Sequence, residues 1–172
     1  MKRKLITAAI IVVCFLLQTT VFKHLSFSGI EPNLMIIVTA TFGFMRGQKS
    51  GAIIGFICGF LMDFISGGAV GINMISFTVI GYINGFFMPI FYDDDITLPL
   101  GLISASDLVY GVIIYLLVFM LKGDFNFIFY LLHIIIPEVI YTLLVTLILY
   151  KIILYFNSKL NVEEQRSASK FV

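Results

Sequence analysis

The chain has 172 residues, of which 60% are hydrophobic and 12% are charged, and its mean hydropathy is +1.06. Soluble domains are about half apolar and about a quarter charged, so this composition excludes an ordinary soluble protein and indicates an integral membrane protein. The formal net charge of +1 gives the chain no basic character, so nucleic acid is not an expected partner.

Apolar runs long enough to cross a bilayer recur along the chain, separated by short polar turns. They predict an all-α, polytopic integral membrane helix bundle, with a single transmembrane domain over residues 1–156. Residues 157–172 form a polar tail that we expect to be disordered and cytoplasmic. The six expected transmembrane helices lie at about 5–22, 33–45, 51–65, 72–91, 98–121 and 128–155.

The first two runs differ in character. The first follows Lys2, Arg3 and Lys4 like a signal peptide, but no small-residue cleavage site comes after it, so we expect an uncleaved first helix. The second begins at Pro32 and Asn33, which suit the first turn and the cap of a helix. It is short, since a dozen residues rise only about 18 Å. We expect it to tilt, to extend through its cap, or to span the membrane incompletely.

Glycine recurs at nearly every fourth position over residues 43–71. The series consists of seven glycines and one aspartate in the remaining slot: Gly43, Gly47, Gly51, Gly55, Gly59, Asp63, Gly67 and Gly71. Residues four apart lie one helical turn above each other, so the glycines form a bare groove that lets another membrane helix come close. That neighbour is either inside the bundle or a partner protein. The candidate packing or interface residues are Gly47, Gly51, Gly55, Gly59, Gly81 and Gly85.

The basic residues predict the orientation in the membrane. With six crossings and a cytoplasmic N-terminus, nine of the eleven Lys and Arg residues are cytoplasmic, and only Lys23 and Lys122 are not. This split follows the positive-inside rule, so both termini are expected in the cytoplasm. A five-span alternative, in which the second and third helices form one broken crossing, would place four of the cations outside and agrees less well.

Three acidic residues lie inside predicted spans: Asp63, Asp107 and Glu138. A charge that faces lipid is costly, so each is expected to face protein or water. Asp63 is either a structural carboxylate that caps a neighbouring helix or a functional polar site. A protonated, hydrogen-bonded acid, an ion pair with Arg46 or Lys49, and a proton relay all remain open. Structural pairing is preferred, because the acids are few and are spread over three helices.

No pattern in the sequence predicts catalysis: there is no phosphate-binding glycine loop, no Ser-His-Asp set and no Cys/His cluster. His133 has Glu138 five residues away and no second His or Cys close by, so we expect a structural histidine rather than a metal ligand. Cys14 and Cys58 lie within apolar runs and are expected to be buried free thiols. We therefore expect no enzyme activity, cofactor or metal.

A set of short motifs covers nearly the whole chain in order. They are Pro32-Asn33-Leu34, Arg46-Gly47, the glycine series with Asp63, Gly71, Gly81-Tyr82-x2-Gly85 and Pro137-Glu138-x2-Tyr141. In this order they resemble the rod shape-determining membrane protein MreD family. The residues matched as family motif are Pro32, Asn33, Arg46, Tyr82, Pro137 and Tyr141. The acidic turn at 93–95 departs from the family pattern, in which a more basic cytoplasmic loop is expected.

The resemblance implies a non-enzymatic scaffold subunit of the bacterial cell-elongation complex in the cytoplasmic membrane. Its implied partners are an MreC-like bitopic membrane protein and, directly or indirectly, MreB filaments and the enzymes of lateral peptidoglycan synthesis. The resemblance also implies a fold similar to the substrate-binding subunits of energy-coupling-factor transporters.

That likeness supplies the alternative function, a small-molecule (vitamin-type) binding subunit of a membrane transporter. The first helix has Ala8 and Ala9 but no line of small residues for a transporter partner, so the scaffold is preferred. A proton-coupled transporter acting through Asp63 and Glu138 is a third, weaker interpretation.

Overall fold

A computed structural model of the chain describes residues 2–26, 29–66, 71–92, 96–119 and 126–168. The all-α prediction is confirmed for these residues. Short π-helical or 3₁₀ segments, labelled η, continue the α-helices. The elements are α1 (Lys2–Leu16), η1 (Leu17–Phe22), α2 (Leu34–Arg46), α3 (Gln48–Ser66), α4 (Ile72–Asn84), η2 (Gly85–Ile90), α5 (Thr97–Ile114), η3 (Tyr115–Phe119), α6 (Phe127–Tyr130), η5 (Leu131–Ile135) and α7 (Ile136–Ala168).

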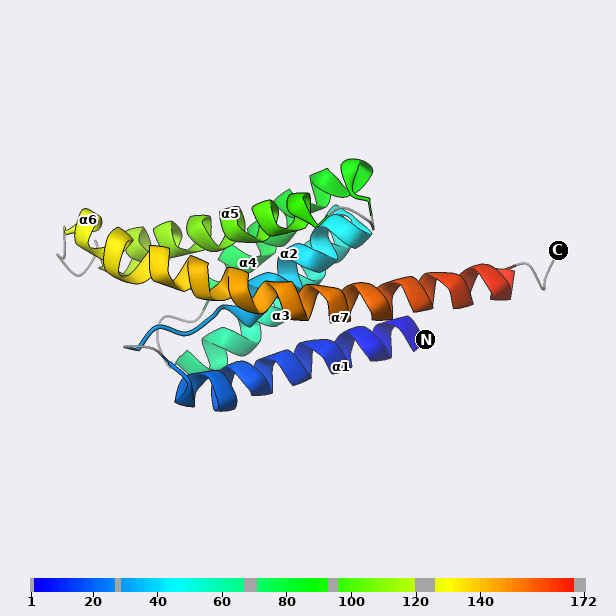
Figure 1. Cartoon of the computed structure of the whole chain (residues 1–172), viewed down its shortest axis with the longest axis horizontal. Coiled ribbons are helices and arrows are strands. Elements are labelled where there is room, and N and C mark those ends of the chain that lie inside the picture. The colour runs from blue at the N-terminus through cyan, green and yellow to red at the C-terminus, as the bar shows by residue number, and fades with distance from the viewer. Residues whose placement is uncertain (1, 27–28, 67–70, 93–95, 120–125, 169–172) are drawn as a thin grey trace.

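Successive helices run in opposite directions along one axis (Figure 1). The start of α1 and the end of α7 therefore lie at the same end of the bundle, which we call the terminal end; the opposite end is the distal end. Five of the described helices are long and apolar enough to cross a membrane: Arg3–Phe22, Gln48–Ile65, Ile72–Ile90, Thr97–Val118 and Phe127–Leu160. The 13 residues of α2 rise about 20 Å, which is less than the hydrocarbon core of about 30 Å.

The boundaries of the last helix correct the prediction for the tail. α6, η5 and α7 form one continuous helix that ends at Ala168, so the segment expected to be disordered from residue 157 is helical as far as residue 168. Residues 157–168 contain neither glycine nor proline to stop a helix. The rest of the tail, the acidic turn at 93–95, Gly67 of the glycine series together with residues 68–70, and residues 120–125 lie outside the described residues.

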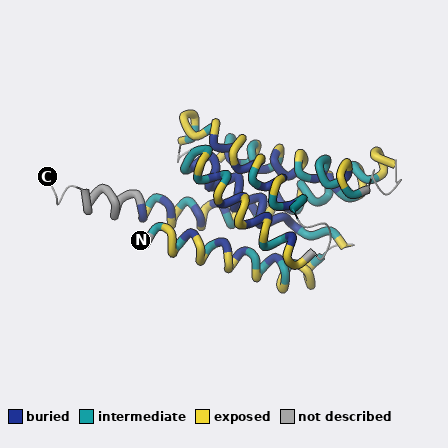
Figure 2. The backbone as a smooth tube through the Cα atoms, turned by 180° about the vertical axis from the view of Figure 1, so that it is seen from behind, coloured by how far each residue is buried: buried dark blue, intermediate teal, exposed yellow. Residues whose placement is uncertain are grey.

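Helix α2 is the centre of the bundle. Every residue from Leu34 to Met45 is buried, because the helix is apolar on all sides and the other long helices surround it. In Figure 2 the buried positions concentrate toward the inside of the bundle, and the exposed positions follow the outer faces of the helices. A helix too short to cross the hydrocarbon core is therefore the most enclosed one, and its position fixes where the others pack.

Helices α3 and α4 pack backbone against backbone along the glycine series. At each of three glycines in α3, a side-chain carbon would collide with a backbone carbonyl group of α4. The facing pairs are Gly51 with Gly81, Gly55 with Phe77, and Gly59 with Asn73. The partner number falls by four for each step of four along α3, which is the register of two antiparallel helices. Gly85 extends the line against Gln48. The glycine series is therefore used inside the bundle.

Helices α2 and α3 form a hairpin with a single connecting residue. Gly47 turns the chain with φ +85°, a conformation that favours glycine, and its N–H donates to the carbonyl oxygen of Gly43 at 2.8 Å. The two helices lie side by side, since a Cβ atom on Gly51 would be only 2.8 Å from Gly43 Cα. They are therefore antiparallel neighbours and not two consecutive halves of one broken crossing, which is the arrangement that the five-span alternative assumes.

Because α3 and α4 are in such tight contact, we expect a single methyl group added between them to lower the stability of the protein. Gly55→Ala would push a methyl group into the Phe77 carbonyl, and overpacking of this kind costs about 1–3 kcal/mol. The melting temperature of the purified protein in detergent should fall. Gly101→Ala in α5 is the matched control, because a Cβ there meets nothing within 4 Å. Equal melting temperatures for the two variants would contradict this account of the interface.

Candidate functional site

The N-terminus of α2 lies inside the bundle, and three of its backbone N–H groups donate to side-chain oxygens. The Asn33 side chain accepts from the Ile36 N–H at 3.2 Å, so the predicted cap is confirmed. Gln18 Oε1 accepts from the Met35 N–H at 3.1 Å. The Asn33 N–H itself donates to Thr142 Oγ1 at 3.0 Å. These bonds satisfy backbone donors that a helix start leaves without partners, as a buried membrane segment requires.

Arg46, at the other end of α2, bonds to α1 and α7. The start of α2 likewise bonds to Gln18 of η1, which continues α1, and to Thr142 of α7. Arg46 Nε donates to Asn157 Oδ1 of α7 at 2.9 Å, and its Nη1 donates to Thr7 Oγ1 of α1 at 2.6 Å. The guanidinium also lies 4.3 Å from the centre of the Phe42 ring. A cation is favourable at the C-terminus of a helix. Polar side chains of α1 and α7 therefore hold α2 at both of its ends.

Asp63 is buried and caps the start of α4. Its Oδ2 accepts from the Gly71 N–H at 2.8 Å and from the Met74 N–H at 3.0 Å, and its Oδ1 accepts from the Asn73 N–H at 3.1 Å. A carboxylate is stabilised there by both the N–H donors and the helix dipole. The structure thus places Asp63 as the cap of a neighbouring helix. An ion pair with Lys49 is excluded, because the two residues are about 21 Å apart along α3.

Asp107 and Glu138 lie together next to the start of α2. The Asp107 carboxylate is beside the Thr142 hydroxyl and the Asn33 side chain, although neither oxygen has a hydrogen-bond partner of good geometry. Glu138 lies near Asp107 and Glu31. The two acids come from α5 and α7, and the bundle brings them to one polar region around Asn33.

Tyr110 connects this region to the Asp63 cap. Its hydroxyl donates to Asn73 Oδ1 at 2.7 Å, and the Asn73 backbone in turn donates to Asp63. Tyr110 also lies near all three intramembrane acids. The acids that the sequence distributes over three helices therefore gather in the distal half of the bundle, around the starts of α2 and α4.

The remaining motif residues serve packing or lie on the surface. Pro32 is buried before the α2 cap. Tyr141 packs its ring against Phe22 and directs its hydroxyl to the Leu25 carbonyl oxygen at 3.4 Å. Pro137 is the second residue of α7, just after the π-helical segment η5 ends, so the N–H that proline lacks falls at the junction of the two segments. Tyr82 is 45% exposed and has no enclosed position in the bundle.

The residues expected to have no special chemistry behave as structural groups. Cys14 and Cys58 are free and buried, as predicted. His133 is exposed, stacks on the Phe129 ring with centres 4.2 Å apart, and lies with Nδ1 3.1 Å from the Phe129 carbonyl oxygen. Across the described residues there is no group of three or more His, Cys, Asp or Glu side chains that could hold a metal ion.

Sequence reasoning missed four residues that hold α2 in place: Thr7, Gln18, Thr142 and Asn157. A usable signal was present, because each is a polar residue inside or beside an apolar run. In a membrane such residues tend to bond across helices. What the sequence does not show is that all four bond to the same helix.

Thr142 and Thr146 provide a matched test of the buried hydrogen bonds at α2. Thr142→Val leaves the Asn33 N–H without its acceptor, and an unsatisfied buried donor costs about 1–3 kcal/mol. Thr146→Val makes the same isosteric change one turn later, where the hydroxyl only donates to the Thr142 carbonyl oxygen of its own helix. Thermal unfolding in detergent should show the larger loss for Thr142→Val. A larger loss for Thr146→Val would mean that Thr142 does not support α2.

Comparisons with known proteins identify the family. A scan against protein families matches residues 2–160 to the rod shape-determining protein MreD, a range that contains α2, the α3–α4 contact and all three intramembrane acids. Searches of the curated proteins and of the solved structures found no match. The likeness to substrate-binding subunits of energy-coupling-factor transporters therefore stays a prediction. The match spans most of the chain, and the protein belongs to the MreD family of rod shape-determining membrane proteins.

Proposed function

We propose that this protein is a non-enzymatic scaffold subunit of the bacterial cell-elongation complex that couples MreB and MreC to lateral peptidoglycan synthesis. Membership in the MreD family over residues 2–160 carries the proposal. Its partners would be an MreC-like bitopic membrane protein and, directly or indirectly, MreB filaments and wall-synthesis enzymes. The vitamin-binding alternative is not proposed, because the family match is to shape-determining proteins.

The hydrogen bonds of the buried polar residues join one helix to another, which supports a scaffold role. Asp63 caps α4, Arg46 ties α2 to α1 and α7, and Asn84 Nδ2 donates to Ser106 Oγ at 2.7 Å between α4 and α5. These groups hold helices to one another. A subunit whose role is to present a defined surface to several partners needs this kind of rigidity.

We further propose that the terminal end faces the cytoplasm of a bacterium and that the protein lies in the cytoplasmic membrane. The support is the nine-to-two division of basic residues, together with the position of the start of α1 and the end of α7 at one end of the bundle. Alkaline phosphatase is active only outside the cytoplasm, so a fusion after Val172 should be inactive. A fusion at the distal loop after Lys23 should be active, and the reverse pattern would contradict this orientation.

Depletion tests the function itself. In a rod-shaped host, loss of the protein should widen and round the cells, and incorporation of a fluorescent D-amino acid along the side wall should fall. Both effects should be reversed by the wild-type chain and by Gly101→Ala, which alters an open position of α5. The measurements are cell width by microscopy and the label on the side wall relative to the division site.

Vitamin supplementation during depletion separates the scaffold from the transporter alternative. Cells that keep their rod shape without the protein would contradict the proposal, and so would rounded cells that regain the shape when vitamins are added.

A further inference from the structure

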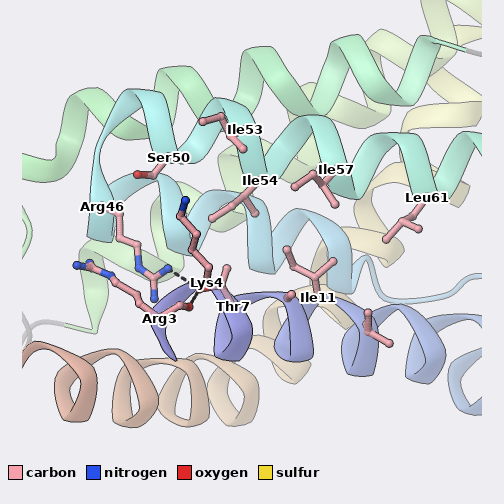
Figure 3. Close-up of a pocket in the computed structure, with 12 residues that line it drawn as sticks. Arg3, Lys4, Thr7, Ile11, Arg46, Ser50, Ile53, Ile54, Ile57 and Leu61 are labelled. Atoms are coloured by element: carbon pink, nitrogen blue, oxygen red, sulfur yellow. Dashed lines mark hydrogen bonds between the residues drawn. The ribbon is translucent and has the colours of Figure 1, made fainter. Parts of the chain in front are cut away.

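A groove of about 810 Å³ lies on the outside of the bundle between α1 and α3 (Figure 3). Its volume is in the range of ligand pockets, which are about 300–1,000 Å³. One end is cationic and is formed by Arg3, Lys4 and Arg46. The rest is apolar, with Ile11 on the α1 wall and Ile54 and Ile57 on the α3 wall. A groove of this shape and polarity suits an amphipathic ligand with a negatively charged head.

The length of the groove matches one leaflet of the bilayer. Along α3 it runs from Ser50 to Leu61, which corresponds to about 17 Å of helix. Half of a hydrocarbon core of about 30 Å is about 15 Å. The groove thus starts at the terminal end and stops near the middle of the membrane. A partner helix that crosses the membrane would need a surface that continues through the other leaflet, whereas a lipid chain needs only this depth.

The cationic end of the groove suits a negatively charged head group. Arg3, Lys4 and Arg46 all line this end of the groove, and none of the residues that line the groove is acidic. Arg46 is held in place by its hydrogen bonds to Thr7 and Asn157, so the head-group end is preorganised. Basic pockets between membrane helices are a known arrangement for anionic lipid head groups.

We propose that this groove binds one anionic phospholipid from the leaflet at the terminal end. The phosphate lies among Arg3, Lys4 and Arg46, and an acyl chain lies along the apolar wall between α1 and α3. The lipid would fill the space between the peripheral helix α1 and the glycine-rich helix α3, so it would also stabilise the position of α1.

The test uses the full-length protein in detergent with three probes: dioleoyl-phosphatidylglycerol, dioleoyl-phosphatidylcholine and inorganic phosphate. Native mass spectrometry should show one retained phosphatidylglycerol, and this lipid should raise the melting temperature. Phosphatidylcholine has the same chains without net charge, and inorganic phosphate has charge without chains, so neither should reproduce the effect. Equal retention of the two lipids, or equal stabilisation by inorganic phosphate, would overturn the proposal.

Two pairs of variants locate the site. Lys4→Gln should weaken phosphatidylglycerol binding about fivefold, whereas Lys151→Gln, at an exposed cation of α7 outside the groove, should not. Ile57→Trp should obstruct the chain wall, whereas Ile75→Trp, at an exposed isoleucine of α4, should leave binding unchanged. Equal effects within either pair would exclude this groove as the lipid site. Loss of a co-purifying protein in Ile57→Trp, with no difference between the lipids, would assign the groove to a protein partner instead.

Discussion

The short helix α2 imposes the main constraint on this bundle. It is buried on all sides and begins inside the protein, where no water is available for the N–H groups of its first turn. Those donors must therefore find acceptors in side chains: Asn33 at the cap provides one, and Gln18 and Thr142 on other helices provide two more. Because Gln18 and Thr142 come from the two ends of the chain, the start of α2 can be satisfied only when α1 and α7 are both in place.

The glycine contact between α3 and α4 complements this requirement. Glycine removes the side chains that would otherwise separate the two backbones, and van der Waals packing then replaces the hydrophobic driving force that is missing in lipid. The same surface continues onto α2, since a Cβ atom on Gly43 would lie 2.8 Å from the Gly81 carbonyl oxygen. Helices α2, α3 and α4 thus form a closely packed unit, and helices α1, α5 and α7 lie around it.

The three intramembrane acids and the cations that line the groove lie in different parts of the bundle. The three intramembrane acids lie in the distal half, where Asp63 caps α4 and the other two acids adjoin the start of α2. Arg3, Lys4 and Arg46 lie at the terminal end. The acidic region and the cationic end of the groove are therefore separate polar regions along the bundle, and a cationic pocket beside membrane helices suits anionic lipid head groups.

Local information in the sequence determined the class of the protein, its helices and several of their ends. The apolar runs, the Asn33 cap and the four-residue glycine spacing all follow from periodicity within one segment. The end of the last helix does not follow from composition, because residues 157–168 are polar but contain no helix breaker and continue α7.

Which helices meet was decided only by the tertiary structure. A glycine line shows that some backbone comes close, but it does not say whether that backbone is α4 or a partner. In the same way, Asp63 needs donors that lie 8 to 11 residues further along the chain, and Asn33 needs a hydroxyl 109 residues away. Such pairings depend on the order in which helices surround α2, and a buried polar group accepts any neighbour of suitable geometry, so the sequence alone does not specify them.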